Sequence, residues 1–435
     1  MSTVADVRLW GSSIGAVSVD GPGEIATFEY TAAFRQSGIE VAPLMMPLAQ
    51  QIYSFSALPQ QSFHGLPGML ADALPDKFGN AVIDAWLAAQ GRLPQDIDAV
   101  ERLCYTGARG TGALEFRPAR GPQSRTSTVL NVGSLVSLAS EVLSNRENLQ
   151  ASFADPLKEH ALREILRVGA SAGGARAKAV IAWNPTTNEV RSGQVKPPIG
   201  FEHWLMKFDG VANNNDRDLA EPQGFGAIEY AYSLMAKAAG IRMSECRLFE
   251  ENGRRHFMTK RFDRLDDGAK LHMQSLGAIA HFDFNNPVAQ SYEQALTVIR
   301  RLGLSMDDIE EQFRRMAFNV IARNQDDHVK NIGFLMDKNG KWSLSPAFDV
   351  MYAYNPSGAW TASHQMSVAG KREGFTLEDL ETVAETAAMK RGRAAAIARE
   401  VTKAVSRWGE FAATAKVVPA QIDMIGRVHR TDLAP

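Results

Sequence analysis

The sequence predicts an α+β fold in which a strand-rich first half is followed by a helical second half. Short apolar runs separated by turn residues fill much of the chain up to residue 264. Long helical patterns dominate from about residue 290 onward. A stretch rich in Pro, Arg and Ser at residues 117–128 has no apolar periodicity, so we expect a linker there, behind an N-terminal α/β subdomain.

Length and composition favour a folded protein of two or three domains. The chain has 435 residues, 45% hydrophobic and 22% charged, which excludes general disorder. Its 47 basic and 49 acidic residues leave a net charge of −2, so any contact with nucleic acid or membrane needs a local patch or a partner. Cys104 and Cys246 lie too far apart for a zinc ribbon, which suits a reducing compartment. Without a signal-peptide pattern or 18 consecutive apolar residues, we expect a cytoplasmic protein.

The elements are expected in three groups. Residues 1–120 form an N-terminal accessory subdomain, with strands within 4–30 and a helical break at Pro75 before an amphipathic stretch at 77–89. Residues 121–264 form a β-rich lobe. Its expected elements are a Gly-rich loop at 168–177, strands at 178–183 and 203–208, a helix at 225–239 and a hairpin at 243–262. Residues 265–435 form a helical lobe with a hairpin inserted at 332–344.

Polar residues cluster at 324–331 (NQDDHVKN), directly after a predicted apolar helix. Asp326 is followed five residues later by Asn331, then by the hairpin and Asp349. Protein kinases use this layout in the catalytic loop and the metal-binding segment. It predicts that Asp326 orients or deprotonates an attacking hydroxyl and that Asn331 and Asp349 hold Mg²⁺ through hard oxygen ligands. Lys330 would offset charge on the transferred phosphoryl group.

Two other interpretations of this cluster remain open. An Asp-Asp-His sequence in a loop commonly forms a helix cap or a solvated turn. Alternatively, Asp326, Asp327, His328 and Asp349 would be ligands of a two-metal phosphohydrolase, although the nine histidines of the chain show no metal-type pairing.

A Gly- and Ala-rich loop at residues 167–178 (RVGASAGGARAK) precedes the cluster. Its small residues let backbone N–H groups approach phosphate oxygens, and Arg176 or Lys178 adds charge. The loop fits neither of the common Gly-rich phosphate-binding patterns, and a plain flexible turn is the alternative.

Two more features follow the loop in the order of a kinase nucleotide site. Lys207 lies inside an apolar strand, where a cation needs an anionic partner, and Glu229 in the next helix is the candidate. The segment 259–264 (TKRFDR) ends the hairpin just before the helical half, where an adenine ring would lie over Phe262. An exposed lysine and a core phenylalanine are the plain alternatives, but the order of the features favours one nucleotide site.

Together these residues resemble the HipA toxin kinases, serine/threonine kinases of bacterial type II toxin–antitoxin modules. The resemblance covers nearly the whole chain. Besides the segments above, it is carried by residues 74–76 (LPD), 107–114 (GARGTGAL) and 348–349 (FD). Asp327 replaces a glycine of some relatives.

The resemblance implies a protein-kinase-like two-lobed fold that uses ATP and Mg²⁺. Asp326 would be the catalytic base, with Lys330 and Asn331 in the catalytic loop, and Asn331 and Asp349 would bind the metal. The implied nucleotide-binding residues are Gly173, Gly174, Ala175, Arg176, Ala177, Lys178, Lys207, Lys260, Arg261, Phe262, Asp263, His328, Asn331, Phe348 and Asp349. Among them, Gly173 to Lys178 would cover the phosphates, Lys260 to Phe262 the adenine, and Asp263 the ribose.

The resemblance also implies regulation and partners. Ser171 occupies the position that family members autophosphorylate, which expels the loop because the added phosphate carries about −1.5 to −2 charge. The implied activity is that of a growth-arresting toxin that phosphorylates an aminoacyl-tRNA synthetase. The implied partner is a small helix-turn-helix antitoxin, similar to HipB, through which the toxin meets operator DNA; no membrane partner is expected.

Two alternative functions remain. One is a non-catalytic, nucleotide-binding co-repressor that works with a DNA-binding antitoxin. The other is a small-molecule phosphotransferase of the aminoglycoside kinase type, although that class requires neither the long N-terminal segment nor the loop around Ser171.

Overall fold

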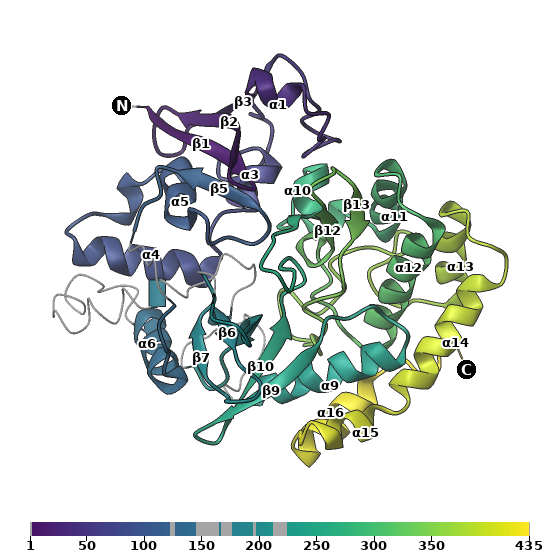
Figure 1. The fold of residues 1–435 in the computed structure, drawn as a ribbon. Coiled ribbons are helices and arrows are strands. Elements are labelled where there is room, and N and C mark those ends of the chain that lie inside the picture. Colours follow the sequence, from purple (N-terminus) through teal and green to yellow (C-terminus); the bar gives the residue numbers. More distant parts are fainter. Residues whose placement is uncertain are drawn as a thin grey trace.

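A computed structural model of the chain describes residues 2–121, 127–144, 165–166, 176–194, 197–211 and 224–434. Over these residues the chain forms three antiparallel sheets, and most of its longer helices follow the second sheet in sequence (Figure 1).

The first sheet has the strand order β4-β3-β2-β1-β5. Its strands are β1 (Thr3–Leu9), β2 (Ser12–Val19), β3 (Thr27–Tyr30), β4 (Ile52–Tyr53) and β5 (Leu114–Arg117). Alternate residues of β1 are buried, which is the pattern of a sheet with one face on a core. The strands expected within residues 4–30 are therefore confirmed.

Short helices connect β3 to β5. They are α1 (Ala32–Arg35), α2 (Gln60–Phe63), α3 (Gly68–Ala71), α4 (Lys77–Ala89), the 3₁₀ helix η1 (Pro94–Asp96) and α5 (Ala99–Thr106). The expected break at Pro75 is confirmed: α3 ends before it, and α4 begins at the N-cap Asp76, whose carboxylate accepts a hydrogen bond from Gly79 N at 2.6 Å. In Figure 1, α4 and α5 lie between the first sheet and the second.

The second sheet has the order β7-β6-β8-β10-β9. Its strands are β6 (Lys178–Trp183), β7 (Val190–Ser192), β8 (Glu202–Lys207), β9 (Cys246–Glu251) and β10 (Arg254–Lys260). β9 and β10 form the expected hairpin, and Asn252 and Gly253 both have positive φ, as a tight two-residue turn requires. Helix α6 (Val132–Ser144) precedes this sheet, and α9 (Phe225–Ala238) lies between β8 and β9 in sequence.

The helical half contains a third sheet of order β11-β12-β13. These strands are β11 (His272–Ser275), β12 (Gly333–Met336) and β13 (Trp342–Leu344), and the last two form the hairpin expected at residues 332–344. The helices are α10 (Leu276–Ala280), η2 (Pro287–Ala289), α11 (Tyr292–Arg301), α12 (Met306–Ile321), η3 (Val329–Asn331), α13 (Leu377–Thr386), α14 (Arg393–Val405), α15 (Trp408–Thr414) and α16 (Pro419–Val428).

The described part of the chain buries its apolar side chains in two main clusters. One joins the first sheet to α9 and the helical half. The other joins α4 to α6, β6, β8 and β10. The N-terminal residues thus divide between both cores, so this subdomain is packed against each half of the molecule rather than appended to one.

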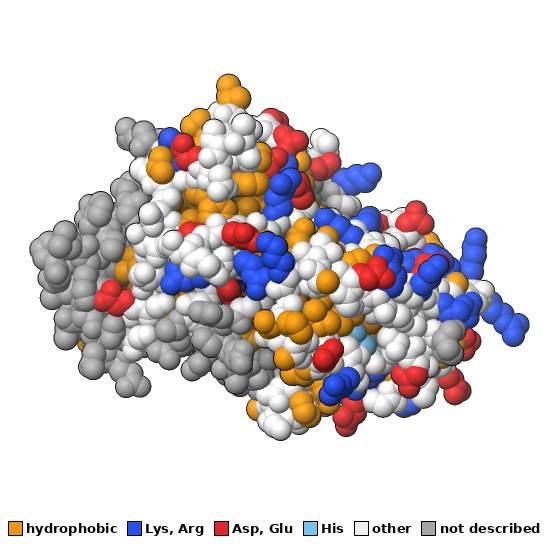
Figure 2. Space-filling view, turned by 90° about the horizontal axis from the view of Figure 1, so that it is seen from below, with side chains coloured by type: hydrophobic (Ala, Val, Ile, Leu, Met, Phe, Trp, Pro, Cys, Tyr) orange, Lys and Arg blue, Asp and Glu red, His pale blue; other side chains and the backbone are white. Residues whose placement is uncertain are grey.

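The surface is mixed in charge. On the face that Figure 2 shows, basic and acidic side chains lie next to one another instead of forming a single basic area. No helix among the described residues has both the length and the apolar character that crossing a bilayer requires.

Candidate active site

Lys207 joins the two halves of the molecule through two ion pairs, of which the one with Glu229 is buried. It lies at the end of β8, and its Nζ is 2.6 Å from Glu229 Oε1 on α9, so the expected partner is confirmed. The same Nζ also contacts Asp349 Oδ1, which comes from the segment after β13. One cation from the second sheet therefore holds a carboxylate from α9 and another from the helical half.

Electrostatics keep this cluster charged. Burial alone would lower the pKa of Lys207, but the carboxylates of Asp349 and Glu229 outweigh burial and raise it. Burial alone would raise the pKa of Asp349, yet Lys207 and Lys178 hold it below its usual range. Burial raises the pKa of Glu229 against the opposing effect of Lys207. Of the two carboxylates, Asp349 is the one whose pKa lies below its usual range.

Asp349 also has an unusual backbone. Its φ is +52°, in the left-handed region that most non-glycine residues avoid and that Asp tolerates better than most. Strained conformations of this kind concentrate at functional sites, where surrounding contacts maintain them.

The catalytic-loop candidates follow α12. This helix begins at a capping box made by Ser305 and Asp308 and ends at Ile321. Beyond it, Asn331 Nδ2 donates to the backbone oxygen of Asp326 at 2.8 Å. That bond ties the first and last members of the predicted Asp-to-Asn spacing together.

His328 and Lys330 complete this loop. His328 Nδ1 accepts a hydrogen bond from Lys330 N at 3.2 Å, so Nε2 carries the ring proton, and Nε2 lies 3.7 Å from Asp326 Oδ1. Lys330 Nζ lies 4.2 Å from the ring centroid of Phe284. Burial lowers the pKa of Lys330, against the attraction of nearby carboxylates that include Asp72.

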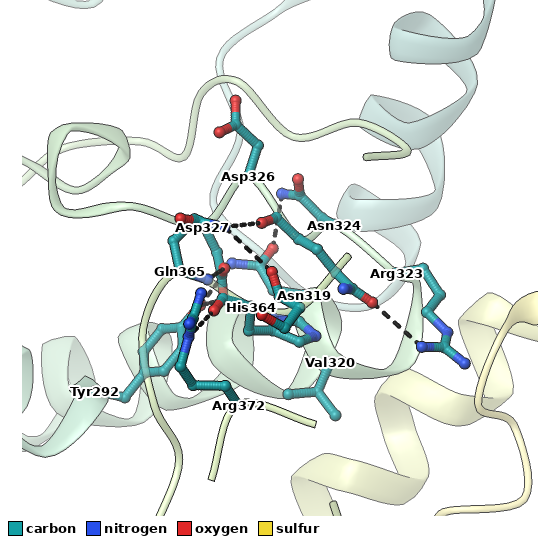
Figure 3. A network of polar contacts seen from close by, with 12 residues as sticks. Tyr292, Asn319, Val320, Arg323, Asn324, Asp326, Asp327, His364, Gln365 and Arg372 are labelled. Carbon is teal, nitrogen blue, oxygen red and sulfur yellow. Dashed lines mark hydrogen bonds and ion pairs between the residues drawn. The ribbon is translucent and has the colours of Figure 1, made fainter. Parts of the chain in front are cut away.

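Asp327 points away from the position of Asp326 and into the protein (Figure 3). Its carboxylate accepts hydrogen bonds from Tyr292 Oη at 2.7 Å, His364 Nδ1 at 2.7 Å and Gln365 N at 2.8 Å. These bonds occupy a carboxylate that the two-metal phosphohydrolase would need as a ligand. The described residues also contain no group of three or more His, Cys, Asp and Glu that could hold a metal ion, so that alternative loses support.

Asn331 and Asp349 are the residues that could hold a magnesium ion. The bond from Asn331 Nδ2 to the Asp326 backbone turns the amide so that its oxygen faces the other way, as a metal ligand requires. Asp349 is ionised, and Mg²⁺ commonly takes one or two protein oxygens together with phosphate oxygens and water.

The described residues of the Gly-rich loop, 176–178, pack against the rest of the protein and are not exposed. Lys178, the first residue of β6, is almost fully buried and lies 3.2 Å from Asp76 Oδ2 at the start of α4. The Arg176 guanidinium lies 4.3 Å from the ring centroid of Phe225 on α9. Ala177 is fully buried. The predicted phosphate-binding residues Gly173, Gly174 and Ala175, and Ser171 before them, lie outside the described residues.

The connector after β10 faces the N-terminal subdomain. Asp263 is buried and accepts hydrogen bonds from Arg261, from Arg264 and from Gly112 N at 2.7 Å. A Cβ on Gly112 would meet Met273 N at 2.7 Å, so only glycine fits this contact. The carboxylate predicted to approach a ribose is therefore engaged in the contact between the connector and residues 110–112.

The other connector residues lie nearer the expected adenine position. The ring centroids of Phe262 and Phe348 are 5.7 Å apart, which brings the connector next to the residue before Asp349. Lys260 turns toward the second sheet, where its Nζ lies 2.8 Å from Glu202 Oε1. The phenylalanine pair is compatible with a stacked base, whereas the Lys260 side chain has its own partner.

Sequence reasoning missed two residues that contact this site. Trp360 Nε1 donates to Asp326 Oδ1 at 2.6 Å from a loop without periodicity or a motif. Asp76 belongs to the segment 74–76, which carries the family resemblance, but the resemblance gave it no role. In the structure its carboxylate pairs with Lys178, about a hundred residues away. No local pattern predicts either contact, because each joins segments far apart in the chain.

A strand-rich lobe and a helical lobe joined through a buried Lys–Glu pair make up a kinase-like fold. Comparison with known proteins agrees. Residues 5–117 match the family "HipA N-terminal domain", and residues 170–408 match the family "HipA-like C-terminal domain".

Two relatives extend this result. The chain is 26% identical over 313 residues to "Toxin YjjJ" of Escherichia coli (strain K12); the match covers 69% of this chain and 63% of that protein, so it spans less than two thirds of the relative's length. HipA of Shewanella oneidensis MR-1, solved with HipB and its operator DNA, shares the fold with a TM-score of 0.67 at 15% identity, covering 99% of this chain and 96% of that chain. The chain belongs to the HipA family of toxin–antitoxin proteins.

Proposed function

We propose that this protein is an ATP- and Mg²⁺-dependent serine/threonine protein kinase that acts as a growth-arresting toxin. The observation that carries the proposal is the contact of Lys207 with both Glu229 and Asp349 beside the loop that contains Asp326 and Asn331. Active kinases require a lysine paired with a glutamate on a helix. They also require a metal-binding aspartate close to that pair.

Each residue has a defined part in the reaction. Asp326 accepts the proton of a serine or threonine hydroxyl as the hydroxyl oxygen bonds to the γ-phosphorus of ATP. The bond from that phosphorus to the β,γ-bridging oxygen breaks, which yields a phosphoester and ADP. Lys207 and Lys330 supply positive charge near the phosphates. Asn331 and Asp349 would hold Mg²⁺, which supplies neutralisation of phosphate charge when bound.

Regulation and partners belong to the same proposal. Ser171 is the proposed site of autophosphorylation, an aminoacyl-tRNA synthetase is the proposed substrate, and a HipB-like antitoxin is the proposed partner. The Shewanella structure, a complex of HipA, HipB and operator DNA, supports the choice of partner.

We predict that Asp326→Ala and Asp349→Ala each abolish phosphate transfer from labelled ATP. The first removes the proton acceptor and the second removes a metal ligand. Transfer to the chain itself and to total protein extract is the measurement, and Asp423→Ala, an exposed aspartate on α16, is the matched control that should keep wild-type activity. Retained transfer in both site variants would rule out the assignment.

The same Asp326→Ala variant separates the proposal from a nucleotide-binding co-repressor. Phosphoproteomics after induction of the wild-type and variant chains should show phosphate on Ser171 and on the substrate in the wild type alone. If the function were only repression, the variant would show the same phosphoproteome as the wild type. A small-molecule phosphotransferase would instead modify no protein in either sample.

A further inference from the structure

Three consecutive residues of the catalytic loop bind one distant segment. Gln325 Nε2 donates to Thr361 O at 3.1 Å, Asp326 Oδ1 accepts from Trp360 Nε1 at 2.6 Å, and Asp327 Oδ1 accepts from Gln365 N at 2.8 Å. The segment 360–365 is thus hydrogen-bonded to the proposed base, Asp326, and to the residues directly before and after it.

The backbone that carries Trp360 is rigidly held. Gln365 is buried, and its Nε2 donates to Trp360 O. The fully buried Gln325 fixes the next carbonyl, that of Thr361. Buried amides that are hydrogen-bonded in this way leave a side chain little freedom to shift. Buried side chains therefore hold the backbone that carries the indole in place beside Asp326.

The contact at Asp326 itself is a charge-assisted hydrogen bond. Trp360 Nε1 donates to Oδ1, and His328 Nε2 lies 3.7 Å from the same oxygen; the two ring centroids are 6.3 Å apart. A donor on one oxygen restrains rotation of the carboxylate. A general base must be held close to its working geometry to be effective.

We propose that Trp360 is a positioning residue for the reaction, which holds the Asp326 carboxylate oriented through its indole N–H. The inference rests on the proposed function, since it takes Asp326 as the base. Trp360 neither binds ATP nor receives the proton; it acts through Asp326 alone. Its loss should therefore lower the maximal rate and leave ATP binding unaltered.

Trp360→Phe tests this role because it keeps an aromatic ring and removes only the N–H. In the full chain with Mg²⁺ and labelled ATP, the maximal rate of self-phosphorylation should fall about tenfold, while the half-saturating ATP concentration stays within about twofold. Rates are compared per mole of ATP-binding sites, so a loss of folded protein, which lowers the number of sites, would leave the corrected rate unchanged.

Trp342→Phe is the matched control. It also removes an indole hydrogen bond, from Trp342 Nε1 to Glu40 O at 3.1 Å, but away from Asp326. Its maximal rate should match the wild type. If Trp360→Phe shows an unchanged maximal rate while Asp326→Ala is inactive, the positioning role is wrong and the proposed function stands. If Asp326→Ala is active, the proposed function itself fails.

A measurement on the wild-type chain covers the case in which Trp360→Phe does not fold. The chain has seven tryptophans, whose indole ¹⁵N–¹H resonances can be compared between the wild type and Asp326→Ala. One resonance should shift in the variant, because the indole N–H of Trp360 loses its acceptor. Seven unchanged resonances would overturn the contact and, with it, the proposal.

Discussion

At the scale of single residues, two adjacent aspartates have opposite environments. The Asp326 side chain is 36% exposed and lies at the site surface, whereas that of Asp327 is 1% exposed. His364 shows how firmly Asp327 is held: its Nδ1 donates to Asp327, and its Nε2 accepts from Arg430 at 3.1 Å. The first aspartate suits chemistry and the second anchors the loop.

We predict that Asp327→Ala lowers the free energy of unfolding by about 3–5 kcal/mol, because it leaves buried donors without their acceptor. Asp326→Ala should change it by less than about 1 kcal/mol, since its side chain is partly solvated. Urea unfolding of the two variants is the measurement, and each serves as the control for the other. Equal losses of stability would contradict the division of roles.

At the scale of elements, hairpins and caps were predictable because their causes are local. The Asn252-Gly253 turn and the helix break at Pro75 each depend on residues within a few positions. The partner of Lys207 was also predictable, because a lysine in an apolar strand needs an anion and Glu229 lies in the next element. The contact of Asp263 was not predictable, since its partner Gly112 is about 150 residues away and belongs to another subdomain.

The connector around Asp263 should make stability depend on acid pH. Burial alone would raise the pKa of Asp263, but Arg261 and Arg264 outweigh burial and lower it far below its usual range. The unfolded state therefore takes up the proton first as the pH falls. The stabilisation is fully present above the unfolded pKa of about 3.9 and is lost as the pH decreases from there toward the folded pKa.

We predict that Asp263→Asn lowers the free energy of unfolding by about 3 kcal/mol at pH 7, because two buried guanidinium groups lose their counter-ion. The variant should also lose less stability than the wild type between about pH 4 and pH 2. Chemical unfolding across this range is the measurement. Asp266→Asn is the control, since that side chain is 95% exposed; an Asp263 variant with the same acid slope as the wild type would contradict the prediction.

At the scale of the whole molecule, the N-terminal subdomain contacts the candidate site at two places. Asp76 pairs with Lys178 at the start of the second sheet, and Gly112 binds Asp263 in the connector. Its apolar residues likewise divide between the two cores. The sequence patterns predict a subdomain here, but its contacts with both halves of the molecule follow only from the tertiary fold. The boundaries at residues 120 and 264 stay predictions.

The charge distribution bears on how the whole protein meets DNA. Each neutralised phosphate releases a counter-ion, so a chain that binds DNA directly needs a concentration of basic residues. This chain has a net charge of −2, and on the face in Figure 2 both signs are interspersed. We predict that the isolated chain does not shift an operator fragment in a gel at about 0.15 M salt. Adding a HipB-like antitoxin should produce a complex that contains both proteins. Retention of DNA by the chain alone, weakening steeply as salt increases, would contradict this prediction, because it would require a basic surface of the chain's own.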